Sequence, residues 1–494
     1  MSELAGLDPI KVRHEKLNKL QELGILPYKY YFEKTHTSVE ILENAEELIE
    51  KETYVKFAGR LMSLREMGKS KFGHLQDTYG KIQIYIRKDV IGEDEFNLFK
   101  YYDIGDHFGV EGKVFKTKTG EITIVVEKIE LLSKSLLPLP EKWHGLKDVE
   151  TRYRQRYVDL IVNPDVRETF IKRTQIIKAV REFLDNKGFL EVETPILQPI
   201  YGGANARPFK THHNALDIDL YLRIADELYL KRLIVGGFEK VYEIGKDFRN
   251  EGMDRNHNPE FTMIEFYQAY VDYNYLMDLV EELITTVAKK VNNTLIVKNP
   301  DFEIDLTPPW ERLSLYDSIK KYTGVDISNM TREELLKLCK EKGMEVEDNF
   351  NRGQLIDELF GEFVEPNLIN PTFIYDYPIE MSPLAKLHRT KKGLTERFEL
   401  IVAKKELCNA FSELNDPLDQ KDRFLKQMEF RRLGDEEAQM MDEDYVRALE
   451  YGLPPTGGVG IGIDRLTMLL TGAPSIRDVI LFPQMKPENK QLNK

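Results

Sequence analysis

The sequence predicts an α+β protein in which a small β-barrel precedes a larger domain built on an antiparallel β-sheet flanked by helices. Three observations support this prediction. The chain has 494 residues, more than one hydrophobic core usually organises. Residues 54–132 contain five short strand-like runs separated by turn residues. Residues 240–270 contain two longer strand-like runs around a polar loop.

We divide the chain on this basis into an N-terminal domain with a leading helix, a linker and a C-terminal domain. The expected boundaries are residues 1–140, 141–165 and 166–494, with a helical insertion around 275–390. The linker prediction depends on Pro138 and Pro140, which interrupt regular structure just before it.

The composition is typical of a soluble globular protein, with 41% hydrophobic and 31% charged residues. No run is long enough to span a bilayer, and the first residues lack the apolar core of a signal peptide. Two cysteines cannot make a disulfide framework and do not imply a zinc cluster. We therefore expect no membrane partner and a cytoplasmic location. The net charge of −14 does not by itself predict nucleic-acid binding.

Residues 9–23 predict a helix that Asp8 caps and Gly24 follows. Its basic residues are Lys11, Arg13, Lys16 and Lys19. We interpret them as a solvated face, and contact with a nucleic-acid backbone is the alternative.

The five runs in residues 54–132 predict a barrel of the oligonucleotide-binding (OB) type. The isoleucines of residues 81–87 alternate with Gln83 and Tyr85, so the isoleucines fill the barrel and the polar pair faces outward. Outward aromatic and amide groups can stack on unpaired bases and bond to them. An exposed aromatic residue on a β-domain is equally often without such a role.

Residues 165–187 predict an amphipathic helix, and the run FLEVETPIL after it predicts a strand that ends at Pro195. A core helix that feeds a core strand is a sufficient explanation of this pattern.

The segment 248–270 places unusual chemistry on one face of a strand. Phe261, Met263, Glu265 and Tyr267 alternate with the residues of the other face, so a ring, a carboxylate and a phenol lie together. Arg249 and Glu251 share one side of the preceding run. Arginine pairs with phosphate oxygens and a ring can stack on a base, which favours a nucleotide site. A surface hairpin with a charged loop is the alternative.

Residues 397–417 predict a second hairpin, which turns at Lys404 and Lys405. Its opposing strands carry Glu399 and Glu406, which could hold one hard cation such as Mg²⁺. Solvated surface acids are the alternative. Asn409, Phe411 and Glu413 share one face of the second strand.

Residues 457–482 begin with a glycine-rich strand, after which Arg465 lies at the start of an apolar helix. A positive charge at a helix N-terminus opposes the helix dipole, and an anionic ligand would relieve this. The alternative is a salt bridge from Arg465 to Asp464 or Asp478.

These features together resemble a known family. FRNEG with the following loop and NPEFT resembles motif 2 of the class II aminoacyl-tRNA synthetases, residues 165–195 resemble motif 1, the dimer interface, and residues 457–482 resemble motif 3. From about residue 10 to about residue 485, the order of features resembles the bacterial-type lysyl-tRNA synthetases. The resemblance implies a homodimer that ligates L-lysine to tRNA(Lys) with ATP and Mg²⁺, through a lysyl-adenylate intermediate.

The resemblance also implies roles for individual residues. The implied catalytic residues are Arg249 and Arg465. The implied ATP-binding residues are Arg249, Glu251, His257, Asn258, Phe261, Glu399 and Arg465. The implied lysine-binding residues are Gly203, Glu227, Arg249, Glu265, Tyr267, Asn409, Phe411, Glu413 and Gly460. The implied metal ligands are Glu399 and Glu406, and the implied anticodon-binding residues are Phe72, Gln83 and Glu121.

Three alternative functions remain open from the sequence. Aspartyl- and asparaginyl-tRNA synthetases share the architecture, but an aspartate substrate calls for basic residues where Glu265 and Glu413 occur. A shortened relative that lysylates a protein would lack the barrel. A non-catalytic RNA-binding module would have lost the motif arginines, yet Arg249 and Arg465 are present.

Overall fold

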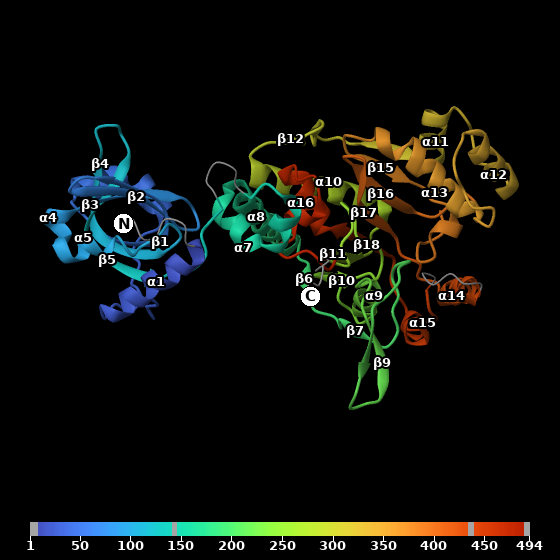
Figure 1. Cartoon of the computed structure of the whole chain (residues 1–494). Helices are drawn as coiled ribbons and strands as arrows, with labels where there is room; N and C mark the ends of the chain where they lie inside the picture. The colour runs from blue at the N-terminus through green and yellow to red at the C-terminus, as the bar shows by residue number, and fades with distance from the viewer. Residues whose placement is uncertain (1–7, 141–145, 433–438, 489–494) are drawn as a thin grey trace. The chain divides into compact units, whose positions relative to one another are not determined.

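The computed structural model describes residues 8–140, 146–432 and 439–488. The chain divides into two compact units, Met1–Lys147 and Asp148–Lys494 (Figure 1). The predicted linker begins at residues 141–145, which lie outside the described residues. Within those that are described, none of the helices combines the length and the apolar character that crossing a lipid bilayer requires.

The first unit is built on a closed five-stranded barrel with the strand order β1-β2-β3-β5-β4. Its strands are β1 (Tyr54–Met67), β2 (Ser70–Gln76), β3 (Lys81–Arg87), β4 (His107–Lys116) and β5 (Ile122–Ser133). The three isoleucines of β3 are buried in the barrel, whereas Gln83 and Tyr85 are half-buried on its outer side. The predicted barrel is confirmed.

Short helices surround the barrel. They are α1 (Pro9–Glu22), α2 (Ser38–Glu43), α3 (Ala45–Glu50), α4 (Lys88–Ile91) and α5 (Glu93–Leu98). Asp8 caps α1 by accepting a hydrogen bond from the Ile10 amide, as predicted. The interpretation of α1 as a solvated basic face is wrong for two residues. Arg13 is buried and donates to the Ile104 carbonyl at 2.9 Å, and Lys16 pairs with Asp103 at 2.5 Å.

The second unit contains an eight-stranded sheet with the order β14-β15-β16-β17-β18-β11-β10-β6. Its strands are β6 (Leu190–Glu191), β10 (Lys240–Phe248), β11 (Glu260–Ala269), β14 (Glu311–Ser314), β15 (Thr372–Tyr375), β16 (Arg397–Val402), β17 (Lys405–Ser412) and β18 (Thr456–Gly462). Neighbours are antiparallel except at the two edges, where β14 pairs with β15 and β6 with β10 in parallel.

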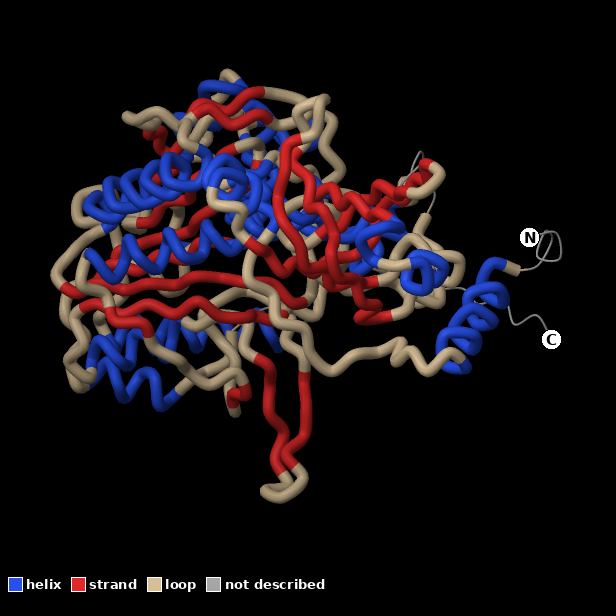
Figure 2. The backbone as a smooth tube through the Cα atoms, turned by 90° about the vertical axis from the view of Figure 1, so that its left-hand side faces the viewer, coloured by secondary structure: helices blue, strands red, loops and turns tan. Residues whose placement is uncertain are grey.

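Two smaller sheets complete the strands of this unit. They comprise β7 (Leu197–Gln198), β8 (Lys210–His213) and β9 (Ile218–Leu222), and then β12 (Ile296–Lys298) and β13 (Glu303–Asp305). The hairpin of β8 and β9 projects from the body of the unit, as both views show (Figures 1 and 2).

The helices of the second unit fall into several groups. They are α6 (Val149–Arg154), α7 (Arg156–Val162), α8 (Pro164–Asn186), α9 (Glu227–Val235), α10 (Tyr273–Asn292), α11 (Leu315–Thr323), α12 (Arg332–Glu341), α13 (Arg352–Phe363), α14 (Pro417–Arg432), α15 (Glu443–Glu450), α16 (Ile463–Thr471) and α17 (Ile476–Val479). Two 3₁₀ turns, Glu365–Asn367 and Ile379–Met381, connect elements.

One face of the large sheet packs against helices, and the other is free for a site. Residues of α8, α10 and α16 form one apolar core with the inward side chains of β11, which include Ile264 and Phe266. Glu265 and Tyr267 alternate with them and therefore point to the opposite face. The predicted division of β11 into two faces is thus observed.

Three predicted boundaries differ from the structure. The helix α10 and the strands β14 and β15 belong to the main core and sheet, so the separate helical subdomain is only the part formed by α11, α12 and α13. The strand after α8 is only two residues long and ends at Glu191, not at Pro195. Residues 149–162 form helices instead of a linker. The fully buried Arg156 ties them to the second unit, because its guanidinium group donates to the carbonyl of Arg477 at 2.7 Å.

A buried arginine ties β10 to the segment that leads into α9. Arg223 pairs with Glu243 at 2.6 Å, Asp226 at 2.8 Å and Asp247 at 3.3 Å, and all four side chains are buried. The space for its guanidinium group exists because residue 245 is glycine. A Cβ atom there would lie 1.9 Å from Nη2 of Arg223.

The substitution Gly245→Ala should therefore destabilise the second unit. Displacing Arg223 leaves buried carboxylates without their counter-ion, which typically costs about 3–5 kcal/mol in the free energy of unfolding. Chemical denaturation would measure this loss. Gly361→Ala on α13 is the matched control, since no atom lies within 4 Å of the added Cβ and alanine favours a helix. Equal stabilities of the two variants would contradict the prediction.

Candidate active site

A cavity of about 430 Å³ opens on the face of the large sheet opposite the helical core. The predicted ligand-binding residues that line it are Gly203, Glu227, Arg249, Glu251, His257, Asn258, Phe261, Glu265, Tyr267, Glu406, Asn409, Phe411, Glu413, Gly460 and Arg465. Glu399 does not line the cavity itself. Residues predicted from four distant segments thus surround one space.

The register of the sheet explains this assembly. Glu265 of β11 lies opposite Gly460 of β18, and Gly460 lies opposite Asn409 of β17. The next row runs from Tyr267 through Gly458 to Phe411. The glycines keep the floor of the cavity low between the larger side chains. A Cβ atom at residue 458 would lie 2.1 Å from Oε1 of Glu413.

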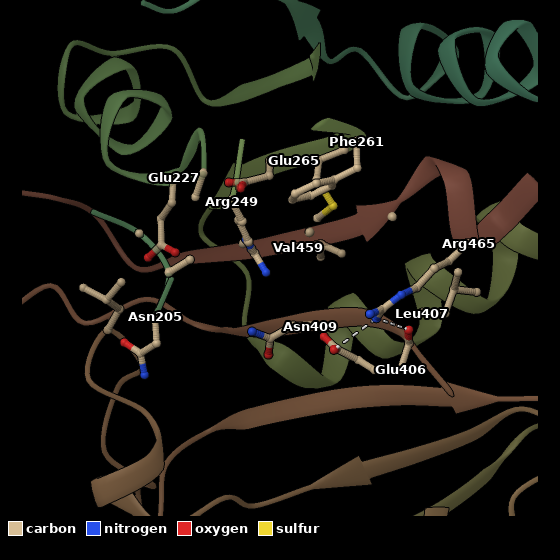
Figure 3. Close-up of a pocket in the computed structure, with 18 of the residues that line it drawn as sticks. Asn205, Glu227, Arg249, Phe261, Glu265, Glu406, Leu407, Asn409, Val459 and Arg465 are labelled. Atoms are coloured by element: carbon tan, nitrogen blue, oxygen red, sulfur yellow. Dashed lines mark hydrogen bonds and ion pairs between the residues drawn. The ribbon is translucent and has the colours of Figure 1, made fainter. Parts of the chain in front are cut away.

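Three carboxylates form one end of the cavity. Glu227, the first residue of α9, Glu265 of β11 and Glu413, just after β17, are all buried. Oε2 of Glu265 accepts from the Tyr267 hydroxyl at 2.8 Å. Figure 3 shows Glu227 on the left, Glu265 nearer the centre, and Arg249 between Glu227 and Arg465.

Burial shifts the acids of this end toward their protonated forms. It raises the pKa of Glu265 to about 8, and the charges of Asp247 and Glu227 add to that rise. Burial also raises the pKa of Glu413 to about 8, against the opposing effect of Lys231. Carboxylates this far out of water require a cation or a proton, so this end of the cavity suits an ammonium group.

Further acids behind Glu265 were not predicted. Single carboxylate oxygens of Asp226, Asp247 and Glu265 lie within 4.8 Å of one another, and burial raises the pKa of Asp226 to about 10. Arg223 is their main counter-ion. In the sequence, only the short spacing between Arg223 and Asp226 could have indicated this ionic cluster. Asp247 joins them only through the fold.

Arg249 lies between the two ends of the cavity. The strand β10 ends at Phe248, so Arg249 and Glu251 follow the strand instead of continuing it. The Arg249 amide donates to the Pro259 carbonyl at 2.9 Å, which closes the loop between β10 and β11. Its guanidinium carbon lies 5.1 Å from the centre of the Phe261 ring, a cation–π contact at the cavity wall.

Arg465 marks the other end of the cavity, on the right of Figure 3. Its Nη1 donates to the carbonyl of Glu406 at 2.6 Å and lies 3.3 Å from that residue's Oε2. The alternative salt bridges from Arg465 to Asp464 or Asp478 are not observed, because both acids have other partners. Asp464 pairs with Arg173 at 2.6 Å, and Asp478 accepts from the Tyr153 hydroxyl at 3.0 Å. Arg465 therefore pairs with Glu406 and not with these two acids, and its side chain lines the cavity.

The loop between β10 and β11 contributes two residues of different character. His257 is half-exposed and lies 3.5 Å from Nη2 of Arg465. Asn258 is buried, and its amide group bonds to the backbone of Glu260 at 2.7 Å and Gln484 at 3.3 Å. Asn258 lines the cavity but primarily fixes the loop.

The acids predicted to bind a metal fit a hard cation. Glu399 and Glu406 lie on the paired strands β16 and β17, and their donor atoms are oxygens alone, which Mg²⁺ prefers. Burial raises the pKa of Glu399 to about 7, and Arg397 opposes the rise while Glu406 adds to it. A cation between the two carboxylates would relieve that repulsion.

Two neighbours of Glu399 were missed in the sequence. Arg397 donates to one carboxylate oxygen at 2.5 Å, and the Tyr377 hydroxyl donates to the other at 2.9 Å. Arg397 also lines the cavity and donates to Asn409 at 3.0 Å. The sequence could have indicated this role, because Arg397 lies two residues before Glu399 and such residues share one face of a strand.

The three residues predicted to bind the anticodon lie together on the barrel. Nε2 of Gln83 donates to Glu121 at 2.6 Å, and the ring of Phe72 stacks on Tyr85 with centroids 4.4 Å apart. His74, which was not predicted, bonds to the other oxygen of Glu121 at 2.8 Å. This outer surface offers rings and amide groups to unpaired bases.

Comparisons with known proteins agree with this geometry. Residues 148–486 match the family of class II tRNA synthetases for D, K and N, and residues 55–132 match the OB-fold nucleic acid binding domain. A lysine–tRNA ligase of Carboxydothermus hydrogenoformans is 60% identical over 97% of this chain and 98% of its own length. The ligase of Moorella thermoacetica is 58% identical over 98% and 99%. That of Clostridium acetobutylicum is 58% identical over 97% and 94%.

Both the family match and these identities extend over most of the chain, including every residue of the cavity described above. The chain therefore belongs to the class II aminoacyl-tRNA synthetases, in the family of lysine–tRNA ligases.

Proposed function

We propose that this chain ligates L-lysine to tRNA(Lys) with ATP, through a lysyl-adenylate intermediate, in translation. The observation that carries the proposal is the polarity of one cavity, with three buried carboxylates at one end and Arg465 at the other. An amino acid with a positive side chain and a triphosphate would fill these two ends. The names of the relatives support the same reaction.

The first step needs no nucleophilic side chain. The lysine carboxylate attacks the α-phosphorus of ATP, the bond to the β-phosphate oxygen breaks, and pyrophosphate leaves. Arg249, between the two ends, would hold the carboxylate against the α-phosphate, and Arg465 would bind the distal phosphates. The reaction then proceeds by positioning and charge neutralisation. The terminal ribose hydroxyl of tRNA next attacks the lysyl carbonyl and releases AMP.

Other cavity residues would orient the substrates. Phe261 offers a ring face to adenine, and the adjacent loop residues Glu251, His257 and Asn258 border it. Glu227, Glu265 and Glu413 would receive the ammonium groups of lysine. The side chains of Tyr267, Asn409 and Phe411 and the backbone of Gly203 and Gly460 would fix its orientation. A neutral amino acid would leave buried acids without partners, which is the physical basis of discrimination.

We also propose that Glu399 and Glu406 hold Mg²⁺. When bound, the ion would neutralise charge on the phosphate oxygens of ATP. The protein's own contribution is to fix the carboxylate of Glu399, whose two oxygens accept hydrogen bonds from Arg397 and Tyr377.

The barrel would read the anticodon through Phe72, Gln83 and Glu121, which share one outer surface. The enzyme would act as a homodimer in the cytoplasm. The segment after α8 supports the dimer, because Leu190, Ile196 and Leu197 are each more than two-fifths exposed there. The free, buried Cys339 and Cys408 suit a reducing compartment.

Exchange between ATP and pyrophosphate should depend on lysine and on no other standard amino acid. Exchange without lysine would refute the proposed function.

The substitution Glu265→Gln should weaken the binding of lysine but not that of ATP. Loss of one buried carboxylate should raise the KM for lysine about 100-fold, equivalent to about 3 kcal/mol, with the KM for ATP within about threefold. Glu260→Gln on the same strand is the control, because its side chain is exposed. Equal increases of the KM for lysine and the KM for ATP would show that Glu265 has been assigned wrongly.

Lysine affinity should rise with pH between about 6 and 7.5. The pKa of Glu265 is raised to about 8, so the free protein holds a proton that the ammonium group must displace. Both ammonium groups of lysine stay charged over most of this range, so the slope reports the protein. Calorimetric titration in buffers with different ionisation enthalpies would detect the released proton. Lysine binding that is independent of pH and releases no proton would contradict this assignment.

Glu406→Gln should raise the Mg²⁺ concentration needed for half-maximal exchange by about tenfold or more, since one of two charged oxygen ligands is lost. The KM for lysine at saturating Mg²⁺ should change little. Glu362→Gln, an exposed acid on α13, is the control. If the two variants require the same Mg²⁺ concentration as the parent, Glu406 is not a ligand.

A further inference from the structure

A lysine of the chain itself lies behind the acidic end of the cavity. Lys231 lies one turn after Glu227 on α9, and its side chain is fully buried. Its Nζ atom lies 2.5 Å from Oε1 of Glu227 and 2.7 Å from Oε2 of Glu413. These two acids border the cavity, but Lys231 does not, so its ammonium group connects them from behind.

The contact with Lys231 leaves one oxygen of Glu413 without a partner. Oε2 bonds to Lys231, whereas Oε1 is buried and accepts no hydrogen bond. Oε1 lies directly above Gly458, beside the Tyr267 ring, on the floor of the cavity. A buried carboxylate oxygen without a donor is costly, and an ammonium group in the cavity would satisfy it.

The position of Lys231 is fixed from several sides. Its Nζ atom lies 5.4 Å from the centre of the Tyr445 ring and 5.8 Å from that of Phe411. Glu227 and Glu413 raise the pKa of Lys231 well above its usual value, although burial alone would lower it. The other titratable or charged groups that face this trio are Glu265 and Tyr267 of β11, Tyr445 of α15 and Arg397 of β16.

We propose that Lys231 is a positioning residue for the lysine site: its ammonium group holds Glu227 and Glu413 in place, favours their ionised forms, and turns the open oxygen of Glu413 toward the substrate's ammonium group. This inference rests on the lysine-binding role proposed above for the two acids. Lys231 itself touches no substrate.

The charges of the site agree with this role. Lys231 places a positive charge between two of the three acids, and its pairing leaves Glu265 and the open oxygen of Glu413 toward the cavity. Without Lys231, two buried carboxylates would face each other without a counter-ion. Such a pair takes up a proton, and the protonated form is a poor acceptor for an ammonium group.

The test is Lys231→Met, which keeps most of the length of the side chain and removes its charge. The KM for lysine in exchange between ATP and pyrophosphate should rise about 100-fold, with the KM for ATP within about threefold. Between pH 6 and 7.5 the lysine affinity of the variant should climb more steeply with pH than that of the parent, by up to tenfold per pH unit, because a further proton must leave. A lysine KM within threefold of the parent, with an unchanged pH slope, would overturn the proposal.

Lys134→Met is the matched control. Lys134 is also fully buried between two acids, at 2.6 Å from Asp103 and 3.0 Å from Asp106, but it belongs to the barrel. Its loss should lower stability without changing either KM. A similar rise of the lysine KM in this control would mean that losing any buried lysine has the effect, and would also overturn the proposal.

A second comparison decides the matter if Lys231→Met does not fold. In Glu227→Gln the acid is neutral and Lys231 still pairs with Glu413. In Glu227→Gln with Lys231→Met the whole pair is removed, which proteins tolerate better than the loss of one partner. Lysine should bind at least tenfold more weakly to the double variant than to the single one, and equal affinities would refute the role of Lys231. Lysine-dependent exchange by the unmodified chain tests the proposed function separately.

Discussion

The second unit depends on holding several carboxylates close together and out of water. Glu227, Glu265 and Glu413 are nearly inaccessible, Asp226 and Asp247 lie close to Glu265, and Glu243 lies opposite Glu265 on the neighbouring strand. Coulombic repulsion and burial both favour protonation of such a group. The fold opposes this with guanidinium and ammonium groups at fixed positions, Arg223 on one side and Lys231 on the other. These cationic groups are therefore in place before any ligand arrives.

An antiparallel sheet suits this task because its two faces are independent. Alternate residues of β11 pack into the helical core or point into the cavity, so an apolar interior and an ionic site share one strand. The glycines of β18 help to form the cavity on one of these faces. Gly458 and Gly460 leave its floor open, whereas neighbouring strands carry long side chains there. Rows of residues across β11, β18 and β17 then align groups that lie far apart in the sequence.

The sequence was informative where a pattern is local. The period of two in residues 260–268 separated the cavity face from the core face, and five short runs indicated the barrel, because both patterns depend on neighbours along the chain. It failed where partners are distant. Lys231 and Glu413 are 182 residues apart, and a lysine four residues after a glutamate on a helix usually forms an exposed pair. The basic residues Arg13 and Lys16 were misjudged for the same reason, since their acceptors lie about 90 residues away on the barrel.

The two ends of the cavity manage their charges in different ways. At the phosphate end, Arg465 contacts Glu406, so a triphosphate and a metal ion would separate a pair that exists in the free protein. Arg465 and Glu406 would then exchange each other for the triphosphate and the metal ion, and these new contacts would offset the cost of separating the pair. At the lysine end no ion pair has to be separated, because Lys231 uses one oxygen of Glu413 and leaves the other open. A permanent counter-ion behind the acids allows a flexible, strongly hydrated ammonium group to be bound without first breaking an internal pair. Selectivity for a cationic amino acid can then arise from the preformed charge, and adaptation to ATP can arise at the end where partners change.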